Sequence, residues 1–176
     1  MADHAAAAGP GLTLVLGGAR SGKSRYAEGL VEALPPPWTY VATAEARDGE
    51  MHERIVAHRA RRGDGWRTVE APHELAATLD RAGAAPVLVD CLTLWLTNRL
   101  LADADLDSDA QVLEAALARR GAATVLVASE VGLGIVPDNA LARRFRDAAG
   151  RLNQRLAARA DRVVLVVAGL PVAVKG

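Results

Sequence analysis

The sequence predicts an α/β domain in which helices cover both faces of a mostly parallel sheet. Short runs rich in Val and Leu alternate along the chain with segments of helical periodicity. The runs are continuously apolar, a pattern typical of parallel strands that are buried on both faces. With 176 residues the chain has the length of one domain. We place this domain at residues 11–176, after a flexible N-terminal tail at residues 1–10.

The predicted elements follow directly from these patterns. Apolar runs bounded by turn residues predict the strands Leu12–Leu16, Trp38–Thr43, Val87–Asp90, Thr124–Ala128 and Val163–Ala168. Helical periodicity predicts the helices Lys23–Leu34, Asp48–Arg62, His73–Arg81, Thr93–Leu101, Asp109–Arg120 and Asn139–Arg159. Because strands and helices alternate, we expect right-handed crossovers between parallel strands.

Several helix ends carry chemical signals. Three consecutive prolines, Pro35–Pro37, cannot continue the first helix because proline lacks the amide donor and restricts the residue before it. Asp138 is expected to cap the last helix, and Gly83 and Gly121 lie where C-terminal caps are expected.

Composition excludes several classes of protein. Lys and Arg (21) equal Asp and Glu (21), so no net basic field favours a nucleic acid as partner. Hydrophobic residues make up 51% of the chain, which is incompatible with disorder, yet no stretch approaches the roughly 20 apolar residues of a membrane span. The start lacks a signal peptide and the single cysteine cannot form an internal disulfide, so we expect a cytoplasmic protein.

A glycine-rich sequence between the first strand and the first helix is the strongest motif. It matches G-x-x-x-x-G-K-[ST] at Gly17, Gly18, Ala19, Arg20, Ser21, Gly22, Lys23 and Ser24. Residue frequencies give roughly 0.001 chance matches in such a chain. Backbone amides in this loop and at the helix start would cradle a triphosphate, with Lys23 as a catalytic residue on the β- and γ-phosphates and Ser24 as a Mg²⁺ ligand. The expected fold is therefore P-loop NTPase-like.

Two acidic residues end neighbouring apolar runs. Asp90 is the candidate carboxylate for Mg²⁺, and its alternative is a capping residue at a strand-to-helix turn. Glu130 is either a second acidic group near the metal or substrate, or the polar exit of a buried strand.

A polar segment rich in histidine and arginine follows the second predicted strand. Glu50, Arg54, His58 and Arg61 or Arg62 share one face of the predicted helix. Positive charge around His58 favours the neutral imidazole, which is the nucleophilic form. From the residues alone, a solvated helix with a surface histidine is the preferred interpretation.

These motifs together resemble the bifunctional adenosylcobinamide kinase / adenosylcobinamide-phosphate guanylyltransferase family of cobalamin biosynthesis over nearly the whole chain. The most specific blocks are Leu88–Asn98 and Ser129–Asn139. The resemblance implies transfer of a nucleoside triphosphate's γ-phosphoryl group to the aminopropanol hydroxyl of adenosylcobinamide. It then implies transfer of GMP from GTP, through a guanylylated histidine, to adenosylcobinamide phosphate, which yields adenosylcobinamide-GDP.

The resemblance also implies roles for single residues. His58 is the expected nucleophile, although some relatives carry two adjacent histidines where this sequence has Ala57 and His58. The expected nucleotide contacts beyond the glycine-rich loop are Ala42, Thr43, Ala44, Arg59, Ala60, Arg61, Arg62, Glu70 and Asp90. Glu70 could accept hydrogen bonds from the guanine N1–H and amino groups. The family further implies a homo-oligomer, with a trimer expected.

Two other functions are compatible with a phosphate-binding loop, which does not define a reaction by itself. One is a monofunctional P-loop kinase for another small alcohol, without guanylyl transfer. The other is a nucleotide-dependent binding protein, although the sequence has no N-K-x-D guanine-reading motif.

Overall fold

A seven-stranded sheet organises the part of the chain that the computed structural model describes, residues 11–45, 49 and 63–176. The strands are β1 (Leu12–Gly17), β2 (Trp38–Ala42), β3 (Trp66–Glu70), β4 (Val87–Asp90), β5 (Thr124–Ser129), β6 (Arg162–Val167) and β7 (Leu170–Lys175). The helices are α1 (Lys23–Glu32), α3 (Leu75–Arg81), α4 (Leu92–Leu101), α5 (Leu106–Arg119) and α6 (Ala140–Arg159).

The sheet order is β3-β2-β4-β5-β1-β6-β7, and every neighbouring pair is parallel except β6 and β7. The register aligns the ends of the parallel strands. Gly17 pairs with Ser129, and Ala42 pairs with both Asp90 and Glu70. These five residues define the carboxyl edge of the sheet, which is where ligands bind in folds of this kind.

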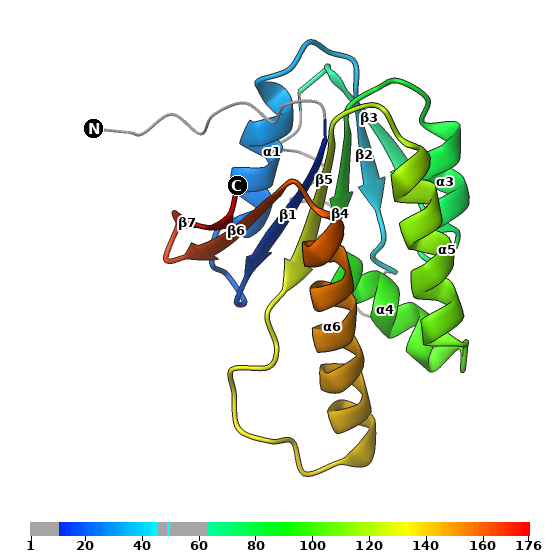
Figure 1. Cartoon of the computed structure of the whole chain (residues 1–176), viewed down its shortest axis with the longest axis vertical. Helices are drawn as coiled ribbons and strands as arrows, with labels where there is room; N and C mark the ends of the chain where they lie inside the picture. The colour runs from blue at the N-terminus through cyan, green and yellow to red at the C-terminus, as the bar shows by residue number, and fades with distance from the viewer. Residues whose placement is uncertain (1–10, 46–48, 50–62) are drawn as a thin grey trace.

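Helices cover both faces of the sheet, as predicted. Ala27, Leu30 and Val31 of α1 pack against one face in a cluster that includes Val15 and Val127. Helices α3, α4, α5 and α6 contribute to a second, larger cluster on the other face. Figure 1 shows α1 on one side of the sheet and α5 and α6 on the other. The predicted fold class is confirmed, and α1 alone covers its face in the described part of the chain.

All predicted strands are present, and the structure adds two at the edges of the sheet. β3 is only half-buried, and every residue of β7 is exposed. A prediction based on continuously apolar, buried runs therefore misses both, because edge strands lack a second covered face. Almost all of the predicted helix Asp48–Arg62 and the predicted tail at residues 1–10 lie outside the described residues.

Helix ends differ from the prediction in local chemistry. The cap of α6 is Asn139, not Asp138, because the Asn139 side chain accepts a hydrogen bond from the Ala142 amide at 2.7 Å. Helix α5 begins at Leu106, earlier than predicted, because Asp105 accepts from the amides of Asp107 and Ser108. Gly83 adopts the left-handed conformation after α3, with φ 58°.

The prediction for Gly121 is wrong. Helix α5 ends in an extended conformation at Arg120, and Gly121 does not have a positive φ. None of the helices in the described ranges is long and apolar enough to cross a membrane.

Candidate active site

The phosphate loop, Gly17–Ser24, lies at the carboxyl edge between β1 and α1. Its backbone curls through left-handed residues, with φ 55° at Arg20 and 92° at Gly22. A β-carbon at Gly17 would overlap the Ser21 hydroxyl and lie 2.7 Å from the carbonyl oxygen of Val166. Only glycine fits this turn. The helix starts at once, with the Tyr26 amide donating to the Gly22 carbonyl at 3.0 Å. The unpaired amides of the first turn of α1 are therefore available for an anion.

Lys23 carries a positive charge that no described carboxylate neutralises. Its Nζ donates to the carbonyl oxygen of Gly18 at 3.1 Å, within the loop itself. A carbonyl is a weak partner for an ammonium group compared with a phosphate oxygen. The side chain is therefore placed over the loop with its charge available to a ligand.

Ser21 contributes a second unsatisfied group. Its hydroxyl is buried and has no hydrogen-bond partner among the described residues. Buried hydroxyl groups are normally hydrogen-bonded, so Ser21 is an exception within the phosphate loop. The sequence places Ser21 in the loop but gives no sign that its side chain is buried.

Asp90 ends β4, two strands from β1 through β5, which is about 10 Å between strand axes. One carboxylate oxygen accepts from the Tyr40 hydroxyl at 3.0 Å, and no described residue donates to the other. The position and the free oxygen fit a carboxylate that binds Mg²⁺ through a water molecule. Tyr40 orients this carboxylate, and the sequence analysis did not identify it.

The Glu130 carboxylate is hydrogen-bonded within the turn that follows β5. One of its oxygens accepts from the Gly132 amide at 2.6 Å, and its backbone amide donates to the Gly17 carbonyl at 3.0 Å. The first contact favours the interpretation of Glu130 as the polar exit of a buried strand.

Thr43 has a role in the scaffold that the sequence does not show. Its fully buried hydroxyl donates to the Cys91 carbonyl at 2.7 Å and accepts from the Cys91 amide at 2.8 Å. The Asn98 side chain donates to the Thr43 carbonyl at 2.8 Å. These bonds join the end of β2 to the start of α4. Thr43 is itself one of the predicted nucleotide contacts, but its side chain is fully buried and bonded inside the protein.

Cys91 itself is not a candidate nucleophile. Burial and, second, the neighbouring Asp90 carboxylate raise the pKa of its thiol to about 11, whereas Lys23 opposes the shift. The thiol is therefore neutral at physiological pH. The influence of both Asp90 and Lys23 at this sulfur is consistent with their positions along one edge of the sheet.

Glu70 marks the far end of the carboxyl edge. It is exposed, and β3 lies four strands from β1, about 19 Å between strand axes. Nearby, Glu45 pairs with His73 at 2.8 Å, which fixes the chain just after Ala44. Glu70 and the phosphate loop therefore cannot contact the same phosphate group. The edge has two ends, each with its own predicted nucleotide contacts.

Other predicted site residues lie outside the described part of the chain: His58, Arg59, Ala60, Arg61 and Arg62. Their roles stay predictions. A residue that the sequence analysis missed is Gly169, whose amide donates to the Ser21 carbonyl at 2.8 Å. The signal for it was the pair Ala168 and Gly169 between two apolar runs, which is typical of a hairpin turn.

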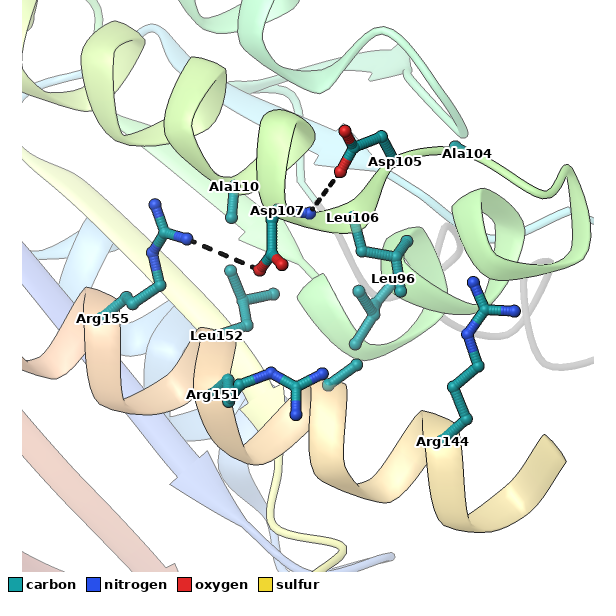
Figure 2. A pocket seen from close by; sticks show the side chains of 11 residues that line it. Leu96, Ala104, Asp105, Leu106, Asp107, Ala110, Arg144, Arg151, Leu152 and Arg155 are labelled. Atoms are coloured by element: carbon teal, nitrogen blue, oxygen red, sulfur yellow. Dashed lines mark hydrogen bonds and ion pairs between the residues drawn. The ribbon is translucent and has the colours of Figure 1, made fainter. Parts of the chain in front are cut away.

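A separate arginine-lined hollow lies between α4, α5 and α6, with a volume of about 240 Å³. Figure 2 shows Arg144, Arg151 and Arg155 projecting from α6 toward the start of α5. Arg155 lies 3.9 Å from Asp107 and also hydrogen-bonds to Glu114. None of the predicted site residues lines this hollow. It is a second cationic region, distinct from the carboxyl edge.

The comparisons with known proteins agree with each other. The sequence profile of the family described as cobinamide kinase / cobinamide phosphate guanyltransferase matches residues 13–174. The chain is 52% identical over 167 residues to the bifunctional adenosylcobalamin biosynthesis protein CobP of Pseudomonas aeruginosa, covering 93% of this chain and 96% of that protein. It is 46% identical over 182 residues to the bifunctional adenosylcobalamin biosynthesis protein CobU of Salmonella typhimurium, covering 93% of this chain and 99% of that protein.

Among solved structures, the flagellar accessory protein FlaH of Methanocaldococcus jannaschii matches with a TM-score of 0.53 and 12% identity. The match covers 96% of this chain and 80% of that one. At this identity the likeness shows a shared fold alone, and that fold is the one the sequence predicts.

Proposed function

Because this chain belongs to the cobinamide kinase / cobinamide phosphate guanyltransferase family, and is a bifunctional enzyme of cobalamin biosynthesis, we propose that its kinase reaction takes place at the phosphate loop. The observation that carries this proposal is the Lys23 ammonium, which no described carboxylate neutralises, beside the unpaired amides of the first turn of α1. The aminopropanol hydroxyl oxygen of adenosylcobinamide attacks the γ-phosphorus of the triphosphate. The bond from γ-phosphorus to the bridging oxygen breaks, the nucleoside diphosphate leaves, and the hydroxyl proton is released.

Residues of the loop act mainly by electrostatics. Lys23 and the amides of α1 stabilise the charge that develops on the phosphate oxygens, which is the main source of catalysis in phosphoryl transfer. The Ser21 hydroxyl would gain the hydrogen bond that it lacks. These groups are held in place before the substrate binds, so little reorganisation is needed at the moment of reaction.

We assign the Mg²⁺ that accompanies the nucleotide to Ser24 and Asp90. The described residues contain no group of three or more His, Cys, Asp or Glu side chains that could hold a metal by themselves. A hydroxyl and a single carboxylate fit Mg²⁺, which keeps most of its waters and binds largely through phosphates. When bound, the ion would neutralise charge on the β- and γ-phosphate oxygens.

For the second reaction we propose His58 as the nucleophile. Its nitrogen attacks the α-phosphorus of GTP and pyrophosphate leaves. A phosphate oxygen of adenosylcobinamide phosphate then displaces the histidine and takes the GMP. Support comes from the far end of the carboxyl edge, where the Glu45–His73 pair anchors the chain that leads to His58 and where Glu70 is exposed. We assign Glu70 to the guanine, and Ala42, Ala44 and residues 59–62 to the remaining nucleotide contacts.

Intact-mass spectrometry after incubation with GTP and Mg²⁺ tests this assignment. The reaction is quenched in alkali because phosphoramidates are acid-labile. We expect a gain of one GMP in the wild type and in His52→Ala, the matched control within the same segment, and no gain in His58→Ala. Kinase activity should remain in His58→Ala. An adduct that persists in His58→Ala would overturn the assignment of the nucleophile.

We also propose a homo-oligomer, with a trimer as the expected form. Large apolar side chains are exposed on β7, at Leu170, Val172 and Val174, and such surfaces often mark contacts between proteins. Sedimentation equilibrium tests this proposal. A mass equal to one chain at micromolar concentration would contradict it.

A further inference from the structure

The loop between β5 and α6, residues 130–139, begins beside the phosphate loop and exposes three large apolar side chains. Leu133 is 86% exposed, Ile135 is 97% exposed and Val136 is 58% exposed. In Figure 1 this loop stands away from the sheet, below the ends of β5 and β1. Holding such side chains in water costs free energy, and clustered exposure of this kind marks a binding surface.

Both ends of the β5–α6 loop are fixed by hydrogen bonds. At the start, the Glu130 amide donates to Gly17 at 3.0 Å, and the Gly132 amide donates to the Glu130 carboxylate. At the end, Arg143 donates to the carbonyls of Pro137 and Asp138 at 2.9 and 2.6 Å. The apolar residues therefore lie on a segment that is anchored before any ligand binds, which reduces the entropic cost of binding.

The loop is joined directly to the catalytic machinery. Gly17, which receives the Glu130 bond, is the first residue of the phosphate loop and pairs with Ser129 in the sheet. When the acceptor hydroxyl attacks a γ-phosphate above Lys23, the rest of the acceptor must lie outside the carboxyl edge of the sheet. Of the described residues at this edge, those of the β5–α6 loop carry large exposed apolar side chains on the β5 side of the phosphate loop, whereas Leu170, next to Gly169, carries one on the β6–β7 side.

We propose that Leu133, Ile135 and Val136 form a seat for the corrin ring of the acceptor. This inference rests on the proposed location of the kinase reaction at the phosphate loop. A corrin is a large ring that carries methyl groups between the amide side chains of its rim, so it offers apolar area that exposed aliphatic side chains can cover. The same surface would serve both reactions, because adenosylcobinamide and its phosphate share the ring and differ only at the reacting end.

Steady-state kinetics of the double variant Leu133→Ser/Ile135→Ser test the seat. The KM for adenosylcobinamide should rise about a hundredfold, since each of the two buried aliphatic side chains contributes about a tenfold factor. The kcat and the KM for ATP should change less than about twofold, because the phosphate loop is untouched. Equilibrium dialysis without nucleotide, followed by the visible absorption of the corrin, should show the same loss of affinity.

A matched pair of single variants controls for exposure and chemistry. Val136→Ser should raise the KM for adenosylcobinamide, whereas Val112→Ser should not, although Val112 on α5 is 55% exposed and the substitution is the same. Equal effects in the two variants would overturn the proposal. An unchanged KM for adenosylcobinamide in the double variant would also overturn the proposal. If the sedimentation mass of that variant is lower than that of the wild type, the loop forms a contact between copies of the chain. A wild type unable to phosphorylate adenosylcobinamide would instead contradict the proposed function itself.

Discussion

The phosphate loop and the arginine-lined hollow of Figure 2 both carry positive charge, but they hold it differently. In the loop, the charge of Lys23 meets only a neutral carbonyl among the described residues, and backbone amides add partial charges. In the hollow, Arg155 faces Asp107 and Glu114, and Arg144 lies 3.9 Å from Asp103. The contrast teaches that a cation beside unpaired backbone amides fits an anion site, whereas arginines paired with carboxylates, here Arg144 and Arg155, serve the fold.

The largest expected effect is a loss of kinase activity on substitution of Lys23 in the phosphate loop. Lys23→Ala should lower kcat/KM for phosphoryl transfer by about a thousandfold or more, about 4 kcal/mol, because a charge acting on the transition state is lost. The melting temperature should stay within about 2 °C of the wild type. Enzyme assays and thermal denaturation check both. Lys175→Ala is the matched control, since Lys175 donates to carbonyls at the end of α6, and a similar loss of activity there would contradict the role of Lys23.

A substitution of Glu114 tests the second region, beside the arginine-lined hollow, where paired charges stabilise the fold. This buried carboxylate joins α5 to α6 by accepting from Arg155 and, at 2.6 Å, from Arg159. Glu114→Ala should reduce the free energy of unfolding by about 2–3 kcal/mol, because two guanidinium groups lose their partner. Urea denaturation measures this change in the free energy of unfolding. At urea concentrations below the unfolding transition, the kinase and guanylyltransferase activities should be unchanged.

The same residue predicts a pH dependence. Burial by itself would raise the pKa of Glu114, but the hydrogen bonds from Arg155 and Arg159 outweigh it and lower the pKa below the ordinary value of 4.5. The stabilisation is therefore fully present above about pH 4.5 and is lost as the pH falls through the lowered pKa. The difference in unfolding free energy between wild type and Glu114→Gln should shrink over that interval. A constant difference from pH 7 to pH 3 would refute the linkage.

A smaller effect is expected at Cys91, whose thiol lies beside the carboxylate of the site. Burial and then the Asp90 charge raise the pKa of this thiol to about 11. Asp90→Asn removes the second cause, so the pKa should fall and alkylation by iodoacetamide at pH 8 should accelerate severalfold. Mass spectrometry of the alkylated protein over time gives the rate. No acceleration would show that the Asp90 charge does not reach this thiol.

Arg151 sharpens the comparison because it lines the hollow without a described ionic partner. It is exposed, so Arg151→Ala should change the free energy of unfolding by less than about 0.5 kcal/mol. Both activities should stay within about twofold of the wild type. A tenfold loss of either activity would make the hollow part of the active site and break the distinction between the two regions.

Local signals explain what could be predicted from the sequence. The interior strands and the phosphate loop were predictable because their patterns lie within a few neighbouring residues. The strands β3 and β7 were missed because edge strands need only partial burial or none. The bonds of Thr43 to Cys91 and of Asn98 to Thr43 join residues 48 and 55 positions apart, which no local pattern encodes. The role of His58 stays a prediction.

The double hydrogen bond of Thr43 limits what evolution or an engineer can change at the end of β2. The Thr43 hydroxyl bonds to both the amide and the carbonyl of Cys91, and the carbonyl also accepts from the Trp95 amide at 3.2 Å, so Thr43→Val would leave the buried Cys91 amide unpaired with almost no change in shape. Thr43→Ser would keep both bonds. In a library of variants designed to alter nucleotide specificity, position 43 should therefore accept only Ser and Thr. The neighbouring positions Ala42 and Ala44 are the better ones to vary.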